Sequence, residues 1–204
     1  MTRTPPPGSL RRRSLLQALG VAALRGVPAI PAAAGLGSFT PVAGAVPATI
    51  TNFEVSRDED GVYLAFSVDF ELGRSVEEAL MKSVPLFFVA EVEIFRDRWY
   101  WRDRRVAHAV RTWRIVYQPL TSTYRVTTVG GLSQSFTSRS DALAAISRAA
   151  RWKIAEPGQI EDGGRHYLEF QYRLETAELP RPMQIGISGE PDWQLSVKRT
   201  LRLH

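Results

Sequence analysis

The stretch from residue 96 to residue 105 carries the side chains best suited to recognise a ligand. It reads Arg-Asp-Arg-Trp-Tyr-Trp-Arg-Asp-Arg-Arg, so three aromatic rings lie among five arginines and two aspartates. Arginine can hold a carboxylate or phosphate through two parallel hydrogen bonds, and tryptophan and tyrosine can stack on a sugar, a base or a peptide. Arg98, Trp99, Tyr100 and Trp101 are therefore candidate binding residues. The alternative is a long hairpin connection whose rings fold back over the sheet, because aromatic residues more often serve burial.

A second group of arginines and tyrosines surrounds the turn expected at Pro119. Its members are Arg111, Arg114, Tyr117, Tyr124 and Arg125. If strands 105–117 and 123–129 pair, Tyr117 and Tyr124 face each other or lie close together. One interpretation is a groove for an anion or a peptide. The other, which the pattern favours, is a cross-strand aromatic and cation–π cluster that holds the hairpin.

Two nearby carboxylates raise the question of catalysis. Glu91 and Glu93 lie two residues apart on an expected strand, hence on one face with their Cα atoms roughly 6.5–7 Å apart. Such a separation could suit carboxylate-dependent hydrolysis, but opposing catalytic carboxylates normally come from different segments. We therefore expect a solvent-facing pair, with Arg111 or Arg114 as partners on the neighbouring strand.

The two internal histidines are expected to be structural. His108 shares a side with Val106 and Val110, and His166 is in phase with Leu168. A lone histidine on an apolar face is more often a hydrogen-bonded core or rim residue than a catalytic or metal-binding one. Cysteine is absent, and no HExxH, GxSxG or P-loop pattern occurs, so thiol chemistry and these motif-based activities are excluded. We expect no catalytic residue, no metal and no cofactor.

The basic charge of the chain belongs to its first 45 residues. The formal charge is +5, yet residues 1–45 contain five arginines and no acidic residue, which leaves 21 basic and 21 acidic residues in 46–204. A neutral domain lacks the broad basic field that nucleic acid requires. An apolar stretch over residues 15–24 would reach roughly 15 Å as a helix, half of a bilayer core. Residues 1–45 therefore read as an export signal and linker.

Details of this leader leave alternatives open. Arg12 and Arg13, followed by Ser-Leu-Leu, resemble the twin-arginine pattern, which is a bacterial export address. The alternative is an ordinary secretory signal with an arginine-rich start. Small-x-small sites would allow cleavage after Ala45, which we favour because regular patterning begins near residue 48, or after Ala34. An uncleaved anchor is the third possibility.

Residues 46–204 are expected to form one all-β domain. Hydrophobic residues alternate with polar ones in residues 62–72, and similar signals recur along the chain. This period of two is typical of strands with one face in the core. The pattern predicts an antiparallel β-sandwich, immunoglobulin-like or an open-barrel variant. The expected strands are 50–56, 62–72, 86–95, 105–117, 123–129, 152–156, 166–174, 183–187 and 193–201.

Two short helices are expected to cover the sheets. Ser75-Val76-Glu77-Glu78 is a capping box, in which side chains satisfy the first free amides of a helix. Ser138 with Asp141 is a weaker version of the same signal.

Asp58-Glu59-Asp60-Gly61 predicts a hairpin turn, because glycine tolerates positive φ.

Several stretches of the chain resemble one family, the uncharacterised proteobacterial family catalogued as domain of unknown function 4390. They are Pro85–Glu93, Arg98–Trp101, Arg111–Arg114, Tyr117–Val126, Gly130–Leu132, Ser135-Phe136, and Ser147-Arg148 before Trp152. The resemblance covers about residues 50–203. It implies an exported protein and suggests a membrane sensor kinase of the nitrogen-regulation type as a partner. It carries over no catalytic residue.

Together these observations predict a periplasmic, non-enzymatic binding or adaptor module of the cell envelope. Its expected partner is an envelope protein, with the sensor kinase as one candidate, and exposed sheet edges could dock it by strand addition. We expect the chain to contact the membrane only through its signal segment, before that segment is cleaved. The alternatives are an envelope structural or assembly factor and a carboxylate-dependent hydrolase of an envelope polymer.

Overall fold

The computed structural model describes residues 47–97, 102–161, 164–187 and 189–203, all within one compact unit, Thr40–His204. The leader with Arg12, Arg13 and the expected cleavage site after Ala45 lies outside the described residues. So do the four candidate binding residues Arg98, Trp99, Tyr100 and Trp101. Among the described residues, no helix combines the length and apolar character needed to span a bilayer.

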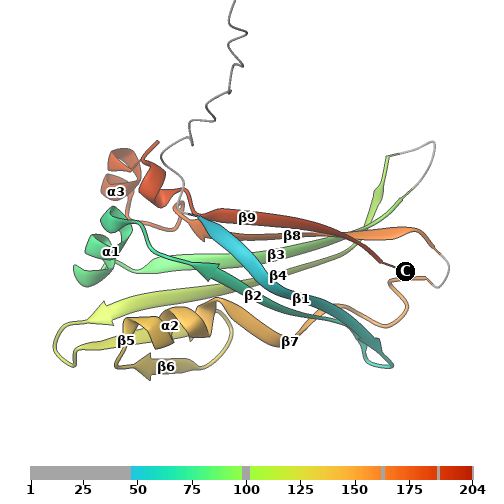
Figure 1. The fold of residues 1–204 in the computed structure, drawn as a ribbon, viewed down its shortest axis with the longest axis horizontal. Coiled ribbons are helices and arrows are strands. Elements are labelled where there is room, and N and C mark those ends of the chain that lie inside the picture. The colour runs from blue at the N-terminus through green and yellow to red at the C-terminus, as the bar shows by residue number, and fades with distance from the viewer. Residues whose placement is uncertain (1–46, 98–101, 162–163, 188, 204) are drawn as a thin grey trace, which may run out of the picture. The chain divides into compact units, whose positions relative to one another are not determined.

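Two antiparallel sheets form the domain, as the alternation predicted (Figure 1). The smaller has the order β1-β2-β7 and the larger β6-β5-β4-β3-β8-β9. The smaller sheet consists of β1 (Ala48–Asp58), β2 (Gly61–Phe70) and β7 (Arg148–Ala155). The larger one consists of β3 (Leu86–Arg96), β4 (Arg104–Gln118), β5 (Thr123–Thr128), β6 (Ser133–Phe136), β8 (His166–Glu175) and β9 (Ser196–Leu203). An all-β, sandwich-like fold is therefore confirmed.

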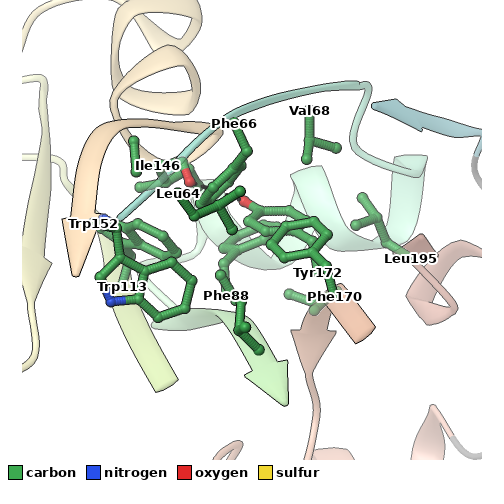
Figure 2. Packing of buried hydrophobic residues seen from close by; sticks show 14 of the residues in the cluster. Leu64, Phe66, Val68, Phe88, Trp113, Ile146, Trp152, Phe170, Tyr172 and Leu195 are labelled. Carbon is green, nitrogen blue, oxygen red and sulfur yellow. Dashed lines mark hydrogen bonds between the residues drawn. The ribbon is translucent and has the colours of Figure 1, made fainter. Parts of the chain in front are cut away.

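The core lies between the sheets and is rich in aromatic rings. Phe66 of β2 contacts Phe170 and Tyr172 of β8, with ring centroids 4.9 and 6.3 Å away. Trp113 of β4 and Trp152 of β7 approach the same ring at 6.4 and 6.2 Å (Figure 2). Burying such residues is the main favourable term in folding. The alternating pattern thus places one face of each sheet in a shared core.

The β1–β2 hairpin forms at the predicted turn. Asp58 pairs with Gly61, whose φ is 138°. A Cβ atom at this position would lie 2.4 Å from the carbonyl oxygen of Ala155 on β7. Glycine is therefore required at residue 61 both for its backbone conformation and for the close approach of the neighbouring strand.

The two predicted helices form, but only one is capped as expected. In α2 (Arg139–Ile146), Ser138 Oγ accepts the Asp141 N–H at 3.1 Å. The capping box predicted at Ser75 is wrong, because α1 (Arg74–Met81) begins earlier and Gly73 at its N-cap offers no side-chain bond. Asp192 Oδ2 accepts the Ser75 N–H at 2.9 Å instead. A residue distant in sequence thus supplies the cap.

The segment expected to be a strand at 183–187 is helical. It belongs to a third helix, α3 (Arg181–Gly186), which is followed by the 3₁₀ turn η1 (Pro191–Trp193). Pro180 is the N-cap residue of α3 and Pro182 lies in its first turn. Proline lacks an N–H, which a central strand needs but the first turn of a helix does not.

Candidate functional site

The predicted pairing of Tyr117 and Tyr124 is confirmed. The two residues are directly opposite each other on β4 and β5, and their ring centroids lie 4.9 Å apart. Tyr124 is buried and its hydroxyl donates to Met81 Sδ, 3.5 Å away, at the end of α1. The pair therefore packs across the β4–β5 hairpin, as the favoured interpretation has it, and Tyr124 also connects the hairpin to α1, which was not expected.

The three arginines predicted beside these tyrosines lie on different faces of the sheet. Arg114 and Arg125 are exposed on the outer face. Arg111 is opposite the buried Ala90, and its guanidinium lies 5.4 Å from the centroid of the Trp152 ring. Removal of water by this packing lowers the pKa of Arg111. The five residues therefore do not line a single groove.

The outer face of the larger sheet carries a network of charged side chains. Glu91 binds His108 Nε2 through Oε1 at 3.0 Å and Arg173 Nη1 through Oε2 at 2.8 Å. Glu93 is paired with Arg105. The expected partners Arg111 and Arg114 are wrong. Glu91 lies opposite Val110, so Arg111 faces the other way, and Arg114 lies opposite Phe87, further along β3. We refer to Glu91, Glu93, Arg105, His108 and Arg173 as the outer-face network.

This outer-face network favours ion pairing over acid–base chemistry. Hydrogen bonds from Arg173 and then His108 lower the pKa of Glu91, so this carboxylate stays ionised and is unsuited to donate a proton. Glu91, Glu93 and His108 offer ligand atoms within 4.8 Å of one another, which is close enough for a metal ion. Arg105 and Arg173 already neutralise the two carboxylates, so we assign these groups to ion pairs.

The histidines differ from each other in their surroundings. His166 is 4% exposed, as its apolar phase predicted, and its Nδ1 lies 3.1 Å from the carbonyl oxygen of Gly164. His108 is exposed, which contradicts its expected place on an apolar face. Val110 beside it is 49% exposed, because this face of β4 carries the outer-face network rather than the core.

A groove of about 750 Å³ lies between the end of β2 and helix α2. Residues 67–72 form one wall, and the side chains of Arg139, Leu143 and Ser147 form the other. Arg139 is paired with Glu77, so an ion pair joins α2 to α1 at the groove. The volume is in the range typical of binding sites for small ligands. We refer to this feature as the β2–α2 groove.

One edge of β2 is open along the β2–α2 groove. The ladder between β2 and β7 ends where Ser67 is opposite Arg148, and beyond it the Val68 N–H donates to Ser147 O at 2.8 Å. Because backbone direction alternates along a strand, the amide and carbonyl of Phe70 face the same side as those of Val68. Within the described residues no strand pairs with Phe70 on that side.

The chain geometry at Ser147 explains why this edge is left open. The N–H of Ser147 bonds to Leu143 O inside the last turn of α2, so the chain changes from helix to strand at this point. Strand β7 therefore does not extend alongside Phe70, and α2 packs against β5 and β6 instead. Phe70 itself is held in position, because its ring stacks on Phe88 at 5.5 Å.

The rim of the β2–α2 groove carries unpaired negative charge. Asp69 and Glu71 are exposed, and neither forms an ion pair within the described part of the chain. Glu77 is already paired with Arg139, and Arg148 Nε donates to Ala144 O at 2.8 Å. Sequence reasoning missed this groove, because alternation predicts strand 62–72 but does not show where its second neighbour ends.

Comparison with known families identifies a match over most of the chain. The family model described as a domain of unknown function (DUF4390) matches residues 45–202. No curated protein and no solved structure matches the chain. The match covers nearly all described residues, including both walls of the β2–α2 groove.

Proposed function

The chain belongs to this family, domain of unknown function 4390, and we propose that it is an exported, non-enzymatic module that binds a partner protein in the cell envelope. The observation that carries the proposal is the open edge of β2 inside the β2–α2 groove. Unpaired strand edges are surfaces that proteins normally cover or block. Here the edge is set in a recess next to a helix.

The state of the carboxylates supports binding rather than catalysis. A hydrolase of the kind considered above needs one carboxyl group that can donate a proton. Glu91 is instead held ionised between His108 and Arg173, and Glu93 is paired with Arg105. These pairs join strands β3, β4 and β8, so they serve the sheet itself.

The place of action rests on the first 45 residues. Their arginines, the apolar stretch over residues 15–24 and the small residues before position 46 support export to the periplasm. The partner is then an envelope protein, and the membrane sensor kinase implied by the family resemblance is the first one to test.

Photo-crosslinking in cells tests this proposal. A photoreactive amino acid at Ser140 would lie at the β2–α2 groove, and the same group at Thr200 would lie on exposed β9 as a matched control. We expect one envelope protein to be recovered from the Ser140 position and not from Thr200. Recovery of the same proteins from both positions, or of none from a correctly exported chain, contradicts the proposal.

A further inference from the structure

We infer that the β2–α2 groove receives its partner as an added β-strand, an extended segment that carries basic residues on either side of an apolar one. This inference rests on the proposed binding function and specifies the chemistry of the occupant. It concerns three consecutive residues, namely Asp69 and Phe70 at the end of β2 and Glu71 directly after it.

The backbone of β2 dictates an extended occupant. Phe70 presents an amide and a carbonyl toward the groove, and no described strand pairs with them there. A peptide strand satisfies such a pair of groups when it lies about 4.8 Å away. The stacking of Phe70 on Phe88 keeps this edge in place before the partner arrives, which lowers the entropic cost of binding.

The side chains of residues 69–72 determine which positions of the added strand are apolar and which are polar. In an added strand, the residue opposite Phe70 shares its face, and the residues on either side share the face of Asp69 and Glu71. Leu143 of α2 and the half-buried Leu72 line the groove with Phe70, so an apolar side chain fits there. The flanking side chains meet Asp69 and Glu71.

The negative charges of Asp69 and Glu71 favour basic residues at the two flanking positions of the added strand. Asp69 and Glu71 are exposed without ion-pair partners in the described part of the chain, whereas Glu77 at the same groove is neutralised by Arg139. Arg148 lies opposite Ser67, where the β2–β7 ladder ends. Its positive charge disfavours a further basic residue of the peptide at that end of the groove. The required motif is therefore basic–apolar–basic, which reads the same in either strand direction.

A designed peptide tests this inference on the chain from residue 46 to residue 204. The probe is an acetylated and amidated peptide, Thr-Thr-Lys-Val-Lys-Thr-Thr, with Glu replacing both Lys in the control peptide. We expect the lysine peptide to bind at least about tenfold more tightly, because two cross-strand charge pairs change sign. Equal binding of the two peptides, or no binding of the lysine peptide, overturns the inference.

Amide hydrogen exchange tests the strand geometry directly. The Phe70 N–H should exchange about tenfold or more slowly when the lysine peptide is bound. The Val68 N–H, already bonded to Ser147 O, is the internal reference and should change little. Binding of the peptide without protection of Phe70 overturns strand addition.

Charge reversal on the protein completes the test. Asp69→Lys with Glu71→Lys should reverse the preference, so that the glutamate peptide binds more tightly. Glu54→Lys with Glu169→Lys makes the same change in net charge on other strands and should leave the preference intact. If Ser140 crosslinks an envelope protein while the lysine peptide fails, the proposed function stands and strand addition is wrong. If both fail, both are wrong.

Discussion

Asp192 caps helix α1 from 117 residues further along the chain, because its Oδ2 accepts the backbone N–H of Ser75 at 2.9 Å. Asp192 belongs to η1 and Ser75 to the first turn of α1. Gly73 makes the approach possible, since a Cβ atom at that position would lie 2.7 Å from the Asp192 Cβ. One half-buried carboxylate thus caps the start of α1.

This cap predicts a pH-dependent contribution to stability. The backbone and hydroxyl of Ser75 lower the pKa of Asp192 from its ordinary value of 3.8. A lowered folded-state pKa means that the cap stabilises the domain above about pH 4 and is lost as the pH falls through that lowered value. We expect Asp192→Ala to lower the melting temperature at pH 7 and to have a smaller effect at pH 2. Equal effects at both pH values would contradict the role of the charge.

The outer-face network predicts a second effect on stability. Replacement of Glu91 by Gln leaves Arg173 and His108 without their shared carboxylate, and we expect a loss of about 1 kcal/mol in the free energy of unfolding by urea at pH 7. Because hydrogen bonds lower the pKa of Glu91 from 4.5, its contribution is present above pH 4.5 and disappears as the pH falls below it. Glu169→Gln, exposed and on the same face, is the control and should change the free energy little.

Filling the β2–α2 groove should abolish partner capture without unfolding the domain. Ala144 lines the groove on α2 and is only partly buried, so a tryptophan at this position can extend into the recess. We expect Ala144→Trp to eliminate the crosslink formed from Ser140 while the thermal melt stays cooperative. Ala150→Trp, at an exposed position of β7, is the matched control and should crosslink normally. Unimpaired capture by Ala144→Trp would show that the groove is not the binding site.

The leader predicts dependence on a specific export route. Replacing both Arg12 and Arg13 by Lys retains the positive charge but removes the twin-arginine pattern. We expect this double variant to accumulate as precursor in the cytoplasm, measured by cell fractionation and immunoblotting. An ordinary secretory signal would tolerate the change, so normal periplasmic accumulation would favour that alternative. The Arg3→Lys variant is the control and should be exported.

Local patterns predicted the elements whose causes are local. Alternating residues in 62–72 produced β2, Ser138 capped α2, and the facing tyrosines at 117 and 124 followed from a short hairpin. Each of these depends on residues within about a dozen positions of one another. The helix at 181–186 also had a local signal, because Pro180 and Pro182 favour a first helical turn over a strand.

Only the tertiary structure decided the contacts between distant segments. The partner of Glu91 depends on strand register and on β8, which lies 82 residues away at Arg173. Asp192 caps α1 from a position 117 residues away in the sequence, and no local pattern identifies it. The β2–α2 groove arises because β7 begins at Arg148, directly after a helix. Sequence periodicity thus determined which face is buried in regularly alternating strands such as β2, since that depends on side-chain alternation alone. In β4 it did not, because Val106 and Val110 lie with the exposed His108. Neighbours, caps and open edges depend on how long-range packing aligns whole strands.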